Sequence, residues 1–353
     1  PVRTELQALR RPPSRITPVP GTPEIFDYPR DIQPIWDRHC LKCHDADNYA
    51  GRALLTGDHG PMFTHSYFTL SARLQVADGR DLARGNYAPY TIGSAASPLL
   101  NKLNAAHYDV ELTPEELRMV KLWIDASATF PGTYAALGGG MIGPYAALQY
   151  GTRPKIDHLS WPGLKSAKEV LDRRCATCHT GARKLPNSPA DDLEFKLHHL
   201  EYGGGKPRFW EPPWVKTSGD GSLRPGSVEW MKQYADPRLQ FSRHILYNLS
   251  RPEKSLQLLA PLARSAGGYA LCGDVFTSPD DPDFRLLLAG VEEAKAYLES
   301  ITRFTMPNFR PEPEYVREMK SYGILRADYR DGEPIDVYDT DRRYWESFWH
   351  LPA

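Results

Sequence analysis

The chain has 353 residues, enough for two domains, and its charge is balanced, with 43 Lys and Arg against 44 Asp and Glu. This balance gives no sign of a nucleic-acid-binding surface. No apolar run is long enough to span a bilayer. The 32 prolines and 27 glycines predict short helices joined by long ordered loops rather than a large sheet.

Residues 1–30 are rich in proline, and we expect them to form an extended arm. The chain begins at Pro1 without a methionine, which predicts a trimmed, mature polypeptide. Asp31 is a candidate N-cap for a short helix that leads into the first of two cysteine motifs. The apolar face of this helix is formed by Ile32, Ile35 and Trp36.

The pattern Cys-x-x-Cys-His occurs at 40–44 and again at 175–179. It is the attachment signature of a c-type haem, because two thiols add to the vinyl groups of one porphyrin and the next residue reaches the iron. We therefore predict two covalently bound haem c groups, with His44 and His179 as the proximal iron ligands. The attachment residues are Cys40, Cys43, Cys175 and Cys178.

Two alternatives exist for these motifs. The first is a pair of zinc knuckles that form one four-cysteine site, although zinc does not require a histidine directly after each pair. The second is a Cys-x-x-Cys redox motif, which normally lies near a βαβ pattern that this sequence does not show. Covalent haem attachment in bacteria follows export, so the haem interpretation predicts a periplasmic or equivalent exported compartment.

Cys272 is the fifth cysteine. We expect it to be a small buried hydrophobic residue, with a ligand or a reactive thiol as the alternatives.

A first cytochrome c-like haem domain is predicted at 31–137. Residues 45–112 are mostly loop, with a short helix opening at Ser97. Thr113 then caps a helix, with Pro114 at the first helical position and Glu116 completing a capping box. The buried face of this helix is marked by Leu117, Val120 and Ile124. It is similar to the closing helix of a cytochrome c domain.

A linker at 138–160 separates this unit from a second cytochrome c-like haem domain at 161–310. Residues 171–175 repeat the pattern of 36–40, and 255–259 repeat that of 97–100. A closing helix is predicted from Asp281 to Ser300. The predicted fold is therefore mainly α, with two tandem haem domains and long Gly/Pro-rich loops. The C-terminal docking tail, 311–353, carries a helix at Glu314–Tyr322 and binds either its own body or a partner subunit.

Several residues are candidates for the second axial ligand of each iron. In the second domain we favour His244, which lies between the haem motif and the closing helix. In the first domain, His107 lies just before the Thr113 cap and suits a distal ligand or a propionate partner. Other candidates are Tyr49, His59, Met62, His65, His198, His199 and Met306. Tyr90 aligns loosely with His244, which would leave the first iron open. The alternative for each histidine is a purely structural role.

Six short motifs extend from about residue 24 to the C-terminus: DIQPI at 31–35 before the first haem motif, LTGD at 55–58, WID at 123–125, RPEKS at 251–255, RFTMP at 303–307 and YVREMK at 315–320. Together they resemble the haem-bearing part of the hydrazine synthase alpha subunit family of anammox bacteria. That family carries an N-terminal β-propeller followed by two c-type haem domains.

The resemblance implies a catalytic haem, where hydroxylamine and ammonia condense, and a bis-histidine haem that passes electrons. Tyr49 would bind the catalytic iron, with Asn48 competing for that position, and His44 would turn to a zinc ion. His179 and His244 would ligate the electron-transfer haem. This sequence lacks the propeller, which supplies part of the catalytic pocket. Either a separate chain supplies that part, or this chain only carries electrons.

Two hypotheses follow. The first is a periplasmic dihaem c-type cytochrome that transfers electrons, with redox partner proteins in a larger multihaem complex. The second is a hydrazine-synthase-like enzyme whose open, Tyr49-ligated haem acts on hydroxylamine, nitric oxide or ammonia. In the second case, nearby carboxylates would move protons: Asp45, Asp47 or Asp58. A purely structural or zinc-binding protein is the remaining alternative.

Overall fold

The computed structural model describes residues 17, 19–73, 75–77, 88–105, 107–136, 160–180, 183–191, 241–330 and 332–348. In this part of the chain the protein is mainly helical, as predicted, and β structure is limited to isolated bridges. None of the described helices combines the length and the apolar character needed to cross a membrane. Nearly all of the predicted linker at 138–160 lies outside the described residues.

The first unit is organised around α1 (Gln33–His39) and α5 (Pro114–Asp125). Their indoles, Trp36 and Trp123, are buried in one apolar core. Tyr28 joins them, because its hydroxyl accepts a hydrogen bond from Trp36 Nε1 at 3.0 Å and its ring centre lies 5.1 Å from that of Trp123. The helix that leads into the first motif is thus packed against the helix that closes the unit.

The start of this first helical segment differs from the prediction. A turn of π-helix at Tyr28–Ile32 precedes α1, and its N-cap is Asp27. Asp31 is therefore wrong as the cap. Its carboxylate instead accepts the backbone N–H of Asp27 at 2.8 Å, from within the turn.

The predicted capping box of α5 is confirmed. The Thr113 hydroxyl accepts the N–H of Glu116 at 3.2 Å, and the Glu116 carboxylate accepts the N–H of Thr113 at 3.0 Å. Glu116 also contacts Arg38 and His39 of α1, at 2.7 and 3.0 Å. The same carboxylate therefore caps the closing helix and ties it to the end of the opening helix. Three shorter helices complete this unit: α2 (Leu41–His44), α3 (His65–Ala72) and α4 (Pro98–Asn104).

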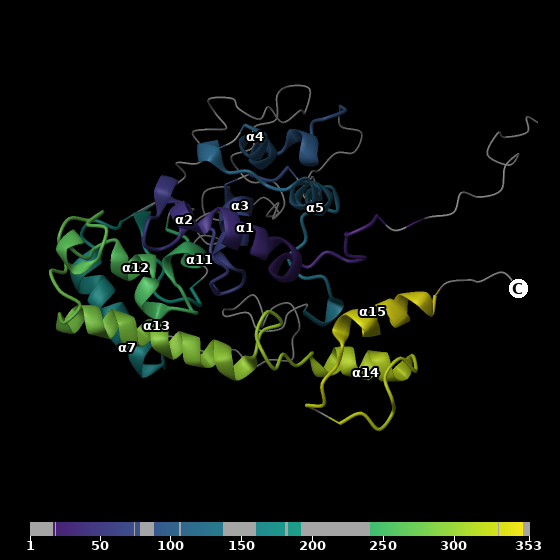
Figure 1. Ribbon diagram of the computed structural model, residues 1–353. Helices are drawn as coiled ribbons and strands as arrows, with labels where there is room; N and C mark the ends of the chain where they lie inside the picture. Colours follow the sequence, from purple (N-terminus) through teal and green to yellow (C-terminus); the bar gives the residue numbers. More distant parts are fainter. Residues whose placement is uncertain are drawn as a thin grey trace, which may run out of the picture.

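In the second unit, α7 (Pro162–Val170) and α13 (Pro282–Ile301) lie side by side (Figure 1). The contact is close, because a Cβ added at Gly290 would come within 2.8 Å of the Cβ of Ala167. Asp281 caps α13 by accepting the N–H groups of Asp283 and Phe284, so the predicted closing helix is confirmed. In the described part of the segment between them lie two short α-helices, α11 (Arg243–Leu246) and α12 (Leu256–Leu259).

The C-terminal segment forms α14 (Pro313–Ser321) and α15 (Val337–Glu346), which lie together at one end of the molecule (Figure 1). Asp341 of α15 is buried and accepts hydrogen bonds from Thr133 and Tyr315 hydroxyls, both at 2.6 Å. The Tyr338 hydroxyl donates to Asp27 at 2.5 Å. The described part of this segment thus packs against the first unit of its own chain.

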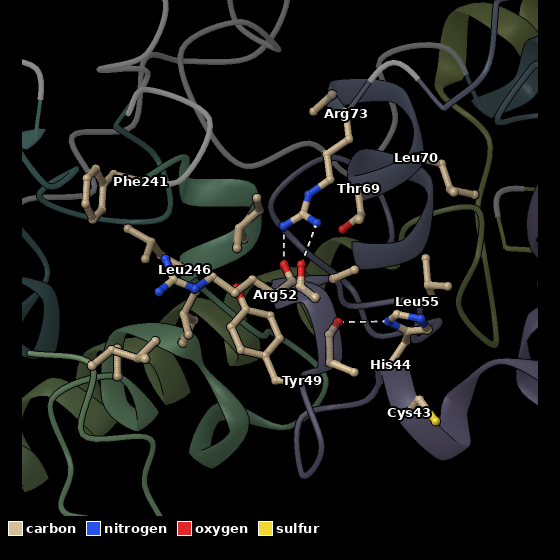
Figure 2. Close-up of a pocket in the computed structure, with 18 of the residues that line it drawn as sticks. Cys43, His44, Tyr49, Arg52, Leu55, Thr69, Leu70, Arg73, Phe241 and Leu246 are labelled. Carbon is tan, nitrogen blue, oxygen red and sulfur yellow. Dashed lines mark hydrogen bonds between the residues drawn. The ribbon is translucent and has the colours of Figure 1, made fainter. Parts of the chain in front are cut away.

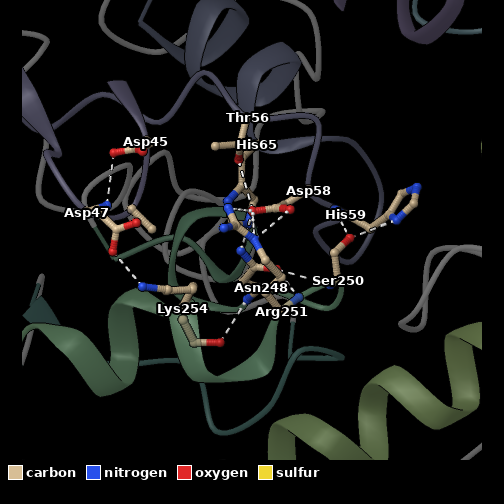
Figure 3. A network of polar contacts seen from close by, with 12 residues as sticks. Asp45, Asp47, Thr56, Asp58, His59, His65, Asn248, Ser250, Arg251 and Lys254 are labelled. Atoms are coloured by element: carbon tan, nitrogen blue, oxygen red, sulfur yellow. Dashed lines mark hydrogen bonds and ion pairs between the residues drawn. The ribbon is translucent and has the colours of Figure 1, made fainter. Parts of the chain in front are cut away.

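The two units meet where α3 packs against α11 (Figure 2). Beside this contact, Asp58 of the first unit accepts hydrogen bonds from Asn248 and Arg251 of the second, each at 2.7 Å (Figure 3). Two further residues of the first unit reach across. His59 is bonded to Ser250 and Thr305 hydroxyls, and His65 Nε2 donates to the Tyr247 carbonyl at 3.0 Å. Both histidines therefore serve this junction.

The junction predicts a pH-dependent stability centred on Asp58. Burial alone would raise the pKa of its carboxyl, but the hydrogen bonds from Arg251 and Asn248 outweigh burial and hold the pKa below its usual range. Because the folded-state pKa is the lower one, the stabilisation is present above the unfolded-state pKa of about 4 and is lost as the pH falls through the folded-state pKa. We expect Asp58→Asn to lower the free energy of unfolding by about 1–3 kcal/mol at neutral pH.

The measurement is denaturant unfolding at neutral pH and again near pH 3, where the difference from wild type should shrink. Asp47→Asn is the matched control, since Asp47 also pairs with a cation of the second unit, Lys254, but its side chain is 64% exposed. Its loss should stay below about 0.5 kcal/mol. Equal losses for the two variants, or a loss that does not depend on pH, would contradict this account of the junction.

Candidate cofactor-binding site

Both cysteine motifs open into one cavity of about 1410 Å³. Pockets for a single small ligand are typically about 300–1000 Å³, so this volume accommodates more than one large group. The wall contains every residue of the two predicted attachment sites: Cys40, Cys43, His44, Cys175, Cys178 and His179. Residues far apart in sequence are thus brought to one space by the packing of the two units.

Each motif is folded as one helical turn. The N–H of His44 donates to the Cys40 carbonyl at 3.0 Å, and the N–H of His179 donates to the Cys175 carbonyl at 2.9 Å. In such a turn, residues three apart lie on the same face, which places the two thiols of each motif side by side. The local fold of the second motif therefore repeats that of the first.

The two motif histidines also make the same side-chain hydrogen bond. His44 Nδ1 lies 3.0 Å from the Ala50 carbonyl, and His179 Nδ1 lies 3.0 Å from the Arg183 carbonyl (Figure 2 shows the first pair). Because a carbonyl only accepts, Nδ1 carries the proton in both rings. Nε2 is left with its lone pair, which is the tautomer of a histidine that binds a metal through Nε2.

The pKa of the first thiol in each motif is raised. Burial, with the charge of Asp37 beside it, raises the pKa of Cys40 to about 12. Burial likewise raises the pKa of Cys175 to about 11. Catalytic Cys-x-x-Cys pairs require the opposite shift, because the thiolate is the reactive form. The redox-motif alternative is therefore disfavoured.

The loop after the first motif is held in an unusual backbone conformation. Tyr49, Gly51 and Arg52 have positive φ angles of 38°, 58° and 54°. Arg73, the residue directly after α3, donates hydrogen bonds to the carbonyls of Gly51 and Arg52 (Figure 2). Arg73 thereby holds the loop that presents the Ala50 carbonyl to His44. These contacts of Arg73 were not predictable from the sequence, because no local pattern links Arg73 to residues some twenty positions earlier.

The chemistry of the wall is apolar and basic. Leucines such as Leu55, Leu70, Leu99 and Leu246 line it, and none of the described wall residues is an aspartate or a glutamate. The cationic side chains on the wall are Lys42, Arg52, Arg73, Lys102, Arg174 and Arg183. Some of these cations have partners, since Arg174 pairs with Asp281 and Asp283 and Arg73 donates to loop carbonyls. A wall that is largely apolar, and that carries cations but no carboxylate of its own, suits a flat, largely apolar group that carries carboxylates. A porphyrin with its propionates has this character, so the residues present fit a haem.

Two further candidates for iron ligands lie on the wall. The ring of His107 faces that of His44, with the ring centres 6.2 Å apart and the planes inclined by 12°. Tyr49 also lines the cavity, but its ring stacks on Tyr269 of the second unit, at 5.2 Å and 12°. The structure thus places His107 beside the motif histidine His44. It places Tyr49 against Tyr269 of the second unit.

His244 is not on the described wall of the cavity. Its side chain is only 3% exposed, and its ring packs 4.6 Å from that of Phe68. Successive residues of a helix point about 100° apart. Because the next two residues of α11, Ile245 and Leu246, face the cavity, His244 is turned toward the junction between the units.

The remaining candidates are also placed away from this wall. Met306 packs in the core of the second unit, Met62 Sδ accepts from Arg243, and Tyr90 is 84% exposed. His198 and His199 lie outside the described residues. The carboxylates proposed to move protons are occupied elsewhere: Asp45 accepts backbone N–H groups of its own loop, and Asp47 and Asp58 pair with cations of the second unit.

The prediction that Cys272 is buried is wrong. It is exposed rather than buried, and it lines the same cavity as the second motif. Its neighbours Ala270 and Gly273 have positive φ angles, so the chain turns sharply here instead of entering a core. Within the described residues, no three or more His, Cys, Asp or Glu side chains are grouped so as to hold a metal ion.

Comparisons with protein-family models, with curated proteins and with solved structures give no significant match to this chain.

The loop contacts of Arg73 can be tested by amide hydrogen exchange. In Arg73→Gln we expect the amides of Arg52 and Ala53 to exchange about tenfold faster, because two hydrogen bonds from a charged donor to this loop are lost. Arg118→Gln is the control, since Arg118 donates to a single distant carbonyl, that of Pro20. Exchange at 52 and 53 that is equal in the two variants would show that Arg73 does not hold the loop.

Proposed function

We propose that this chain is a dihaem c-type cytochrome that transfers electrons. One haem c is attached at each motif, through Cys40 and Cys43 and through Cys175 and Cys178. His44 and His179 are the proximal iron ligands. The observation that carries this proposal is the repeated hydrogen bond from each motif histidine to a backbone carbonyl, which leaves both Nε2 atoms available at one cavity.

Iron ligated in this way changes its oxidation state by one electron, and the protein sets the potential through ligands, hydrogen bonds and burial. The chain supplies each of these. The carbonyls of Ala50 and Arg183 fix the imidazole rings and increase their basicity, and the leucine wall excludes water. The cations on the wall balance the propionates. Under this proposal the two redox groups share one cavity, so that electrons would pass between them.

The same proposal implies where the protein works. Covalent haem attachment takes place after export, so the proposed compartment is the periplasm or its equivalent. An electron carrier needs a donor and an acceptor, and we propose redox partner proteins, with this chain as a subunit of a larger multihaem complex. Each unit is proposed to be a cytochrome c-like domain, in line with the opening and closing helices that flank each motif.

A hydrazine-synthase-like enzyme is the second candidate. It is favoured by the position of Tyr49 on the cavity wall, five residues after His44, in a left-handed backbone conformation of a kind that often marks functional sites. In that case the first iron would be open and bound by Tyr49, a zinc ion would lie near the first domain, and hydroxylamine, nitric oxide or ammonia would react there.

The haem proposal is tested by counting covalent haem in protein exported together with the cytochrome c maturation machinery. We expect two haems per chain in the wild type, one in Cys40→Ala/Cys43→Ala and one in Cys175→Ala/Cys178→Ala. A haem stain on a denaturing gel and a pyridine haemochrome titration give the count.

Cys272→Ala is the control, since this exposed cysteine belongs to neither motif and its loss should leave both haems in place. Wild-type protein without covalent haem, or with zinc in stoichiometric amount at the motif cysteines, would refute the proposal.

A further inference from the structure

His107 and His44 come from different elements and meet at the cavity. His44 ends α2, and His107 begins a short 3₁₀ turn, His107–Asp109, after α4. Both rings line the cavity, their centres lie 6.2 Å apart, and their planes are nearly parallel, at 12°. Aromatic pairs in proteins have ring centres about 4.5–7 Å apart, and this pair lies within that range.

This separation has a chemical meaning when a metal is considered. A histidine nitrogen binds a metal at about 2 Å, and the centre of the imidazole ring lies about 1 Å beyond that nitrogen. Two imidazoles on opposite sides of one metal therefore have ring centres about 6 Å apart. The 6.2 Å between the ring centres of His44 and His107 is compatible with that value and also with ordinary ring packing.

We propose that His107 is the second axial ligand of the haem iron at the first motif, so that this iron is six-coordinate and closed. The inference rests on the proposed haem at Cys40 and Cys43 and goes beyond it, because it assigns the coordination and hence the role of that haem. A closed iron carries electrons and offers no position for hydroxylamine or nitric oxide.

The surroundings of His107 support a ligand role. Its ring lies at the cavity wall beside those of His44 and Tyr108, with ring centres 6.2 and 4.7 Å away. The following backbone is strained, with φ angles of 49° at Tyr108 and 63° at Asp109. Left-handed residues of this kind cost about 1–3 kcal/mol each and persist where the surrounding structure fixes them.

Tyr49 is held differently. Its ring is stacked on Tyr269 and packs with Ala46, Leu54 and Leu259 in an apolar cluster between the units. That position stabilises the junction. A propionate-binding role for His107 is also not required, because the first unit places three cationic side chains on the cavity wall, namely Arg52, Arg73 and Lys102.

The test uses the full-length, haem-loaded protein and EPR of the ferric state. In the wild type, the first haem should give a rhombic low-spin signal, since nearly parallel imidazole planes split the iron d orbitals strongly. In His107→Ala, one haem equivalent should become high-spin, and added imidazole should restore the low-spin signal. His107→Met should stay low-spin with a higher midpoint potential, because a thioether ligand favours ferrous iron.

His39→Ala is the matched control. His39 lies on the same wall, but its ring is bonded to Glu116, so the spectrum should not change. A low-spin spectrum that persists in His107→Ala overturns the proposal, and so does loss of the signal in Tyr49→Phe alone. The haem count of each variant distinguishes a failure of the proposed function from a failure of the His107 assignment. Protein without covalent haem would refute the proposed function itself, whereas two haems with no response to His107 would refute only this assignment.

Discussion

The cavity depends on the charge pair between Asp58 and Arg251, which joins the two units beside it. A carboxylate taken out of water must be matched by donors, and here both main donors come from the other half of the chain, Arg251 and Asn248. A shifted docking of the units would leave Asp58 buried and unpaired. His59 and His65 add bonds that only one arrangement satisfies. The junction therefore fixes the register in which the two cysteine motifs face one space.

The helices of this protein were predictable where the signal is local. Thr113 with Glu116 and Asp281 with its two N–H partners are caps formed within four residues, and both were recognised from the sequence. The first helix shows the limit. Its π-helical turn moves the cap to Asp27, and a pattern based on the α-helical period does not register such a turn. Local rules fail there because the hydrogen-bond spacing itself changes.

The site was predictable as chemistry but not as geometry. The motif spacing predicts four attachment cysteines and two histidine ligands, and this assignment stays a prediction. It contained no information on whether they share one cavity, since that follows from packing between units. For the same reason the orientation of His244, the exposure of Cys272 and the contacts of Arg73 were not predictable. Each depends on which face of a turn meets the other unit. A shift of the turn by one residue would place a different side chain on that face.

The composition of the wall bears on the choice between electron transfer and catalysis. Reduction of nitrogen compounds consumes protons, and a general acid must lie within hydrogen-bond reach of the substrate. The described wall has no aspartate or glutamate, and Asp45, Asp47 and Asp58 are engaged in loop and junction contacts. A general acid on this wall would therefore be a side chain of another type, such as a histidine, a tyrosine or a lysine. Electron transfer requires no proton donor at the iron. It requires buried redox groups with fixed ligands and balanced charge, and under the proposed function the paired carbonyl bonds, the leucines and the cations of this cavity would serve these ends.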